Sequence, residues 1–249
     1  MAQHRKAVFA LVRPWLDADG FTSERIAALD QGLAAAGIAP DAGGQPPAAS
    51  STTRLAEPAA FFAHIKRTNT LGPTLEQDEV DGCNAIIEAC GHAGWPIADT
   101  AYALATAYHE TAGTMKPIRE YGRGKGRKYG APTRHGGQIA FGRGYVQLTW
   151  DYNYERADRE LGLGGRLLAD FDLALDPAIA AAIMVRGMRE GWFTTRDLDD
   201  DLPRQGAATL EQFVRSRDII NGTDKALKIG REAIDFQAGL IAGGWRAAT

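Results

Sequence analysis

The sequence predicts a mainly α-helical protein with one small β element. Two apolar runs, residues 101–110 and 178–190, each precede a glycine that can end a helix. The second run follows Asp176-Pro177, an N-cap residue with proline at the first helical position, and is apolar nearly all round, which indicates a buried central helix. A third segment, IAFGRGYVQLTW at 139–150, has the β-branched and aromatic content of a short strand or hairpin.

The composition of residues 40–58 divides the chain. This stretch is rich in Pro, Ala, Gly and Ser and has no hydrophobic periodicity, which is typical of a linker. It separates a short N-terminal helical module, residues 1–39, from residues 59–249, which have the length of one globular domain.

Short motifs recur on the two sides of this linker. FALVR at 9–13 is echoed by FAHIK at 62–66, and each is followed by an apolar helical run that ends at a glycine. We interpret residues 1–39 as a possible duplicate of the helical hairpin at 60–91, with Thr22 and Thr74 as N-caps. Coincidence between two amphipathic helices is the alternative.

Bulk composition narrows the function classes. Lys and Arg total 28 against 31 Asp and Glu, a net charge of −3, so no global basic character points to nucleic acid. No apolar stretch approaches the ~18 residues that span a bilayer. The N-terminus has no signal-peptide core, which predicts synthesis in the cytoplasm. Cys83 and Cys90, about 10 Å apart on one predicted helix, are too far apart for a disulfide and are expected to be reduced and buried.

The first chemical candidate is Glu110, at the end of the helix predicted over 101–110. The negative end of the helix dipole and the apolar neighbours both favour a protonated carboxyl group, which a general acid requires. A surface Glu near a helix end is the alternative. The segment is not a zinc motif, because HEXXH would need histidine at position 113, where Gly113 stands. We expect no metal and no cofactor.

A second carboxylate, Glu120, follows Pro117 in a loop or strand. Two carboxylates on neighbouring elements can flank a glycosidic bond, with water between, as inverting glycosidases require. A solvated loop Glu remains the alternative. Around Glu120 lies a basic segment, 119–134, with two interleaved tyrosines. This segment suits an anionic or sugar-rich polymer, with nucleic acid and a merely solvated loop as the rival interpretations. Its cations are Arg119, Arg123, Lys125, Arg127, Lys128 and Arg134.

Three ordered motifs resemble the signature segments of family 19 chitinases, which have a lysozyme-like fold. These are His109-Glu-Thr111, FGRGYVQLTWDYNY at 141–154, and Asp218-Ile-Ile-Asn-Gly222. The longer string YALATAYHETAGTMKPIREYGRGKGRKYG at 102–130 resembles the phage and prophage endolysins of that group. The resemblance covers about residues 58–240 and leaves out 1–39.

The resemblance implies a role for each matching residue. Glu110 matches the catalytic acid, Glu120 the second carboxylate as the endolysins place it, and Thr149 and Asn221 the pair that holds the attacking water. Gln147 and Asn153 match polar residues of the sugar cleft. Lys228 falls where plant members carry an arginine near the acid, although lysine lacks the bidentate fork. The candidate sugar or substrate contacts are His109, Tyr121, Arg123, Trp150 and Tyr152.

The implied activity is metal-independent, inverting hydrolysis of a β-1,4-linked, N-acetylated aminosugar polymer by a monomer. The lack of disulfides and the basic segment favour the endolysin branch and peptidoglycan, whose peptide stems carry carboxylates, with chitin as the second substrate candidate. Such a protein would act at the bacterial cell wall after release by a holin, lysis or a secretion apparatus. A lytic transglycosylase and a non-enzymatic glycan-binding protein remain alternatives.

Overall fold

The computed structural model describes residues 54–220 and 222–246. The N-terminal module predicted at 1–39, most of the linker predicted at 40–58, and the N-cap predicted at Thr22 lie outside these residues.

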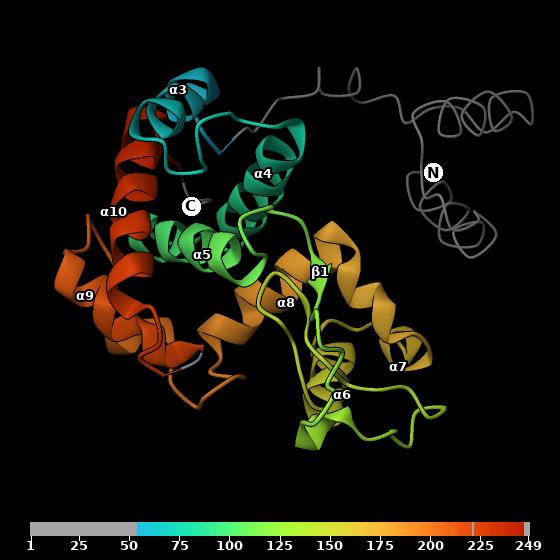
Figure 1. Ribbon diagram of the computed structural model, residues 1–249. Coiled ribbons are helices and arrows are strands. Elements are labelled where there is room, and N and C mark those ends of the chain that lie inside the picture. The colour runs from blue at the N-terminus through green and yellow to red at the C-terminus, as the bar shows by residue number, and fades with distance from the viewer. Residues whose placement is uncertain (1–53, 221, 247–249) are drawn as a thin grey trace, which may run out of the picture. The chain divides into compact units, whose positions relative to one another are not determined.

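The described chain is mainly α-helical with one small antiparallel sheet, which confirms the predicted fold class. Helix α5 runs across and packs against the upright α10, and α3 and α9 also pack on α10 (Figure 1). Helix α4 packs on α8, which leads toward the half that contains the sheet, α6 and α7 (Figure 1). The α-helices are α3 (Pro58–Thr68), α4 (Gln77–His92), α5 (Ile97–Glu110), α6 (Asp151–Glu160), α7 (Arg166–Ala169), α8 (Pro177–Arg189), α9 (Leu210–Arg215) and α10 (Ala226–Ala242).

The β element lies where the sequence predicted it, but one of its strands comes from further upstream. Strand β2 (Arg143–Gly144) lies within the predicted segment 139–150, and an isolated bridge joins Arg143 to Leu148. Its antiparallel partner is β1 (Ile118–Arg119), immediately before Glu120. Four 3₁₀ turns complete the described elements: η2 (Lys128–Gly130), η3 (Phe171–Leu175), η4 (Leu198–Asp200) and η5 (Ser216–Ile219).

Helix α8 forms as its sequence signals predict. Asp176 Oδ1 accepts hydrogen bonds from the backbone N–H groups of Ala178 and Ile179, both at 3.0 Å, and thereby satisfies two of the free donors at the helix start. The helix is buried along most of its length, and Gly191 follows it with φ +63°. Short-range capping and patterning are therefore sufficient to define this element.

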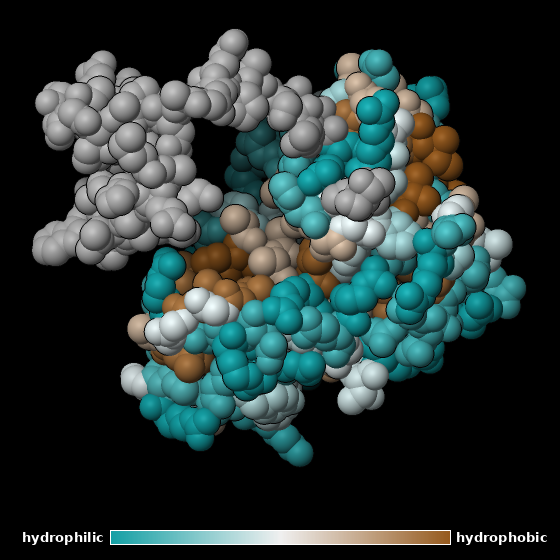
Figure 2. All heavy atoms as spheres, turned by 180° about the vertical axis from the view of Figure 1, so that it is seen from behind, coloured by the Kyte–Doolittle hydropathy of each residue, from teal (hydrophilic) through white to brown (hydrophobic). Residues whose placement is uncertain are grey.

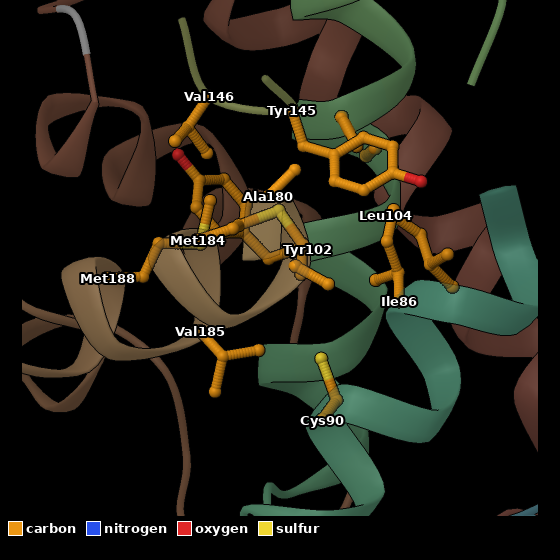
Figure 3. Close-up of a cluster of buried hydrophobic side chains, with 14 of the residues drawn as sticks. Ile86, Cys90, Tyr102, Leu104, Tyr145, Val146, Ala180, Met184, Val185 and Met188 are labelled. Carbon is orange, nitrogen blue, oxygen red and sulfur yellow. The ribbon is translucent and has the colours of Figure 1, made fainter. Parts of the chain in front are cut away.

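The core fills the space between α4, α5 and α8. Ile86 and Cys90 from α4, Tyr102 and Leu104 from α5, and four residues of α8 meet there together with Tyr145 and Val146 from the loop after β2 (Figure 3). Both cysteines are free and buried, as predicted. Because α5 and the β2 loop share this core, packing fixes the helix end that carries Glu110 relative to the loop that follows β2.

Two predictions on local structure are wrong in detail. Thr74 is not the N-cap of the helix over 77–92; Glu76 caps it in a reciprocal capping box with Glu79, which offers a second carboxylate-to-backbone hydrogen bond. The end of the predicted linker also belongs to the folded unit. Leu55 is buried and forms an antiparallel bridge with Trp245 near the C-terminus.

The surface of the folded unit agrees with its charged composition. Seen from behind, hydrophilic residues cover much of the described unit, and hydrophobic residues gather in a band near its middle (Figure 2). Among residues 54–220 and 222–246, no helix combines the length and apolarity that a bilayer crossing requires.

Candidate active site

Both candidate carboxylates line one cavity of about 560 Å³. Glu110 contributes from the C-terminal end of α5, and Glu120 from the position directly after β1. Gln147, Thr149 and Asn153, which the sequence predicted to line a sugar cleft or hold water, lie on the same cavity. The remaining lining residues are Tyr129, Gly142, Val146, Trp150, Tyr152, Phe193, Thr194, Ile220 and Gly222.

Glu110 is held by a buried arginine that the sequence reasoning missed. Nη2 of Arg217 lies 2.9 Å from Glu110 Oε1, and the two side chains are 1% and 14% exposed. Nε of Arg217 donates to the carbonyl oxygen of Asp224 at 3.0 Å. The adjacent Ser216 is fixed as well, because the Tyr102 hydroxyl donates to its carbonyl oxygen at 2.7 Å. Arg217 therefore orients the Glu110 carboxyl group from a rigid, buried position.

The third residue of the HET motif closes the helix end. The hydroxyl of Thr111 donates to the carbonyl oxygen of Ala107 at 2.7 Å and accepts from the backbone N–H of Met115 at 3.0 Å. Met115 in turn packs against α4 at Gly82, where a Cβ atom would clash with the Met115 carbonyl oxygen. These contacts fix the chain direction immediately after Glu110.

Glu120 is oriented by hydrogen bonds to both of its carboxyl oxygens. Oε1 accepts from the Tyr129 hydroxyl at 3.0 Å, and Oε2 accepts from the backbone N–H of Gly142 at 3.1 Å. The backbone N–H of Glu120 also donates to the Gly142 carbonyl oxygen at 2.7 Å. Burial, together with the hydrogen bond to Glu120, raises the pKa of Tyr129, so its hydroxyl stays a donor at neutral pH.

The Gln147 side chain lies close to Gly142. A Cβ atom there would lie 2.8 Å from Oε1 of Gln147. Gln147 itself adopts a left-handed φ of +51°, and its amide nitrogen donates to the carbonyl oxygens of Ile118 and Gly144, both at 3.2 Å. Gln147 thus ties the two strands together on the floor of the cavity.

An acid from η3 clamps the two strands from the other side. Asp172 accepts from Arg119 at 2.6 Å and from Arg143 at 2.7 Å, and these arginines are paired residues of β1 and β2. The Arg143 side chain is only 6% exposed and lies over the Phe141 ring at 3.7 Å. The bond from Arg119, reinforced by Arg143, holds the pKa of Asp172 below its usual range, so the clamp is charged at neutral pH.

Aromatic rings form one wall of the cavity. Trp150 meets Tyr129 edge-on with ring centroids 5.6 Å apart, and stacks with Tyr152 at 5.9 Å and 22° between planes. Tyr152 is largely exposed, while Trp150 is half-buried. Asn153 is tied by its amide nitrogen to the Thr149 carbonyl oxygen at 3.0 Å. Such a wall offers ring faces and edges on which sugar rings can stack.

Four predicted substrate contacts lie elsewhere. His109 and Lys228 line a separate cavity of about 340 Å³ together with Tyr108, and burial lowers the pKa of His109. Lys228 lies 3.7 Å from Glu232, whereas the cation at Glu110 is Arg217. Tyr121 is 84% exposed and Arg123 is also exposed, and neither lines the carboxylate cavity. Asn221 lies outside the described residues.

Sequence reasoning also missed cavity residues beyond Arg217. Phe193 and Thr194 line the cavity from the turn after α8, and the Thr194 hydroxyl donates to the carbonyl oxygen of Asp218 at 2.7 Å. Arg217 directly precedes the motif Asp218-Ile-Ile-Asn-Gly222, which was the only available signal for it. Within the described ranges, no cluster of three or more His, Cys, Asp and Glu side chains could hold a metal ion.

Comparisons with known proteins were made at the level of sequence and of structure. No protein-family model matches the sequence, and no curated protein sequence matches it. Among solved structures, chitinase C from Streptomyces griseus HUT6037 is similar at 22% identity and a TM-score of 0.45, over 79% of each chain. A mutant of chitinase C is similar at 21% identity and a TM-score of 0.47, over 83% of this chain and 86% of that one. A bacterial family 19 chitinase is similar at 20% identity and a TM-score of 0.43, over 75% of this chain and 96% of that one.

Proposed function

We propose that this protein is an inverting glycoside hydrolase that cuts β-1,4 bonds between N-acetylated aminosugars. The observation that carries the proposal is the single cavity lined by Glu110 and Glu120, each oriented by partners of its own. Glu110 lies in the motif that resembles family 19 chitinases, and Glu120 lies in the longer string that resembles the endolysins of that group. The aromatic wall of Trp150 and Tyr152 supplies a surface for sugar rings.

In the proposed mechanism, Glu110 protonates the glycosidic oxygen as the bond to the anomeric carbon breaks. Glu120 accepts a proton from water, and the hydroxide attacks the anomeric carbon from the opposite face. Arg217 orients the acid. Tyr129 and the N–H of Gly142 occupy one position on each Glu120 oxygen, so the remaining lone pairs are available to water. Thr149 and Asn221 are proposed to position that water.

We propose peptidoglycan as the preferred polymer, in an endolysin-like role at the bacterial cell wall. Two cations of the basic segment are neutralised, because Arg119 pairs with Asp172 and Arg134 with Glu155. The four between them form no ion pair with any described residue. These unpaired cations, Arg123, Lys125, Arg127 and Lys128, favour a polymer whose peptide stems carry carboxylates over uncharged chitin.

The test is the product that the enzyme forms first from purified peptidoglycan and from chitin oligosaccharides. Nuclear magnetic resonance should show the inverted, α-configured reducing end from the β-linked substrate. A Glu120→Gln variant should lose at least about 10²-fold in kcat. Anhydro products with activity retained in Glu120→Gln would replace hydrolysis by lytic transglycosylation. Polymer binding without new chain ends would replace the enzyme by a glycan-binding protein.

A further inference from the structure

A second, smaller cavity of about 150 Å³ adjoins the carboxylate cavity. The two cavities share Tyr129 and Trp150, whose edge-to-face pair forms the wall between them. A substituent on a sugar held in the carboxylate cavity could therefore pass the rim of this aromatic wall and enter the smaller cavity. Besides these two rings, Lys128 and Asp151 line the smaller cavity.

The smaller cavity is lined by one cationic side chain and one anionic side chain that form no ion pair with each other. The Lys128 side chain forms no hydrogen bond or ion pair with any residue of the described ranges. Asp151 forms no ion pair there, and its one partner is the backbone N–H of Tyr152, which donates to Oδ1 at 2.9 Å. Arg134, a cation of the same basic segment, differs because it pairs with Glu155 at 2.6 Å. Opposite charges that face one cavity without meeting leave a gap that an amphoteric ligand can fill.

The backbone around the cavity is fixed by its own hydrogen bonds. Pro132 and Ile139 form an antiparallel bridge, and the backbone N–H of Thr133 donates to the Gln138 carbonyl oxygen at 2.9 Å. The backbone N–H of Trp150 donates to the Ala140 carbonyl oxygen at 3.0 Å. The backbone that carries the polar groups is thus preformed, which lowers the ordering entropy that the protein loses when a ligand binds.

We propose that this cavity binds an amino-acid residue of the peptidoglycan stem peptide that carries both a carboxylate and an ammonium group. Lys128 pairs with the carboxylate, and Asp151 pairs with the ammonium. The inference rests on the proposed function, because the stem must hang from a sugar in the neighbouring cavity. Chitin carries neither charge, so the smaller cavity would distinguish the two polymers. A free stem residue without its ammonium would satisfy only half of the site.

The test compares glycan strands that keep their stem peptides with strands from which an amidase has removed them. For Lys128→Met and Asp151→Asn in the full chain, we expect KM for stem-bearing strands to rise about five-fold or more relative to KM for stripped strands. The control is Lys66→Met, which removes an exposed cation of α3 that lines neither cavity and should leave that ratio at the wild-type value.

A binding measurement separates this proposal from the catalytic one. The Glu110→Gln protein should bind a stem-bearing disaccharide in calorimetry more tightly than the same disaccharide without its stem, and Lys128→Met should remove most of the difference. An unchanged KM ratio together with equal binding of both disaccharides would overturn the stem site while leaving the glycosidase intact. A wild-type protein that cuts neither strand and binds neither disaccharide would overturn both proposals.

Discussion

The pairing of Arg217 with Glu110 should appear as a large coupling energy. Arg217→Met removes a cation that is 1% exposed and leaves Glu110, 14% exposed, without its charged partner. Breaking a buried ion pair from one side costs about 3–5 kcal/mol, which corresponds to a fall in Tm of roughly 6–20 °C at about 2–4 °C per kcal/mol for a domain of this size. Glu110→Gln is also costly, because it leaves Arg217 buried and unpaired.

The double variant Glu110→Gln/Arg217→Met lacks both partners of this contact and should therefore cost less than the sum of the single variants. We expect a coupling of about 1–3 kcal/mol in the unfolding free energies, measured by urea titration with circular dichroism at neutral pH. Arg217→Lys keeps the charge but cannot reach both Glu110 and the Asp224 carbonyl oxygen with a fork, so its cost should be intermediate. Additivity within about 0.5 kcal/mol would refute the account of this pair.

Two further predictions concern acids outside the cavity. Asp172→Asn removes the charge that clamps β1 to β2 and should lower the unfolding free energy by about 1–3 kcal/mol. It should also change kcat more than KM, because Glu120 follows the clamped strand. The exposed control Glu211→Gln should change the unfolding free energy by less than about 1 kcal/mol, and equal effects of the two variants would contradict the clamp. Burial raises the pKa of Asp99 to about 6 despite its bond from Arg189 at 2.6 Å. The folded state then binds more protons than the unfolded state between about pH 4 and pH 6, so the contribution of Asp99 to stability falls as pH rises through that window. In urea titrations, Asp99→Asn should flatten the slope of the unfolding free energy against pH. An unchanged slope would contradict the raised pKa of Asp99.

Elements with strong local signals could be predicted from the sequence, and elements set by packing could not. Asp176-Pro177 and an apolar run were sufficient for α8, because a cap and a buried face act within one helix. The cap at Thr74 was wrong because two nearby glutamates offered the better reciprocal hydrogen bonds. Strand β1 has only two residues, which is too short for an alternating pattern to show.

The same division holds for the candidate site. The motifs at 109–111 and 141–154 predicted that Glu110, Gln147, Thr149 and Asn153 would come together, and the longer string at 102–130 added Glu120. All five residues line one cavity. The cation beside Glu110 could not be identified from the sequence, because the sequence does not show which arginine is buried. Only the packing of the fold decides that.

Lys228, which the sequence predicted near Glu110, is not the cation beside it. It lies on α10 with its side chain 63% exposed and lines a different cavity, whereas the buried Arg217 directly precedes the third motif in the sequence. The small cavity beside Trp150 could not be predicted either, because Lys128 and Asp151 are separated in the sequence and only the fold brings both to one cavity.

The central claim is that Glu110 protonates the bond that the enzyme breaks. The most direct test is release of reducing ends from purified peptidoglycan and from chitin by the wild type, Glu110→Gln and the exposed control Glu211→Gln. The account predicts that wild type and control cut at the same rate and that Glu110→Gln is slower by at least about 10²-fold with its fold intact by circular dichroism. A folded Glu110→Gln protein that still cuts at the wild-type rate would contradict it.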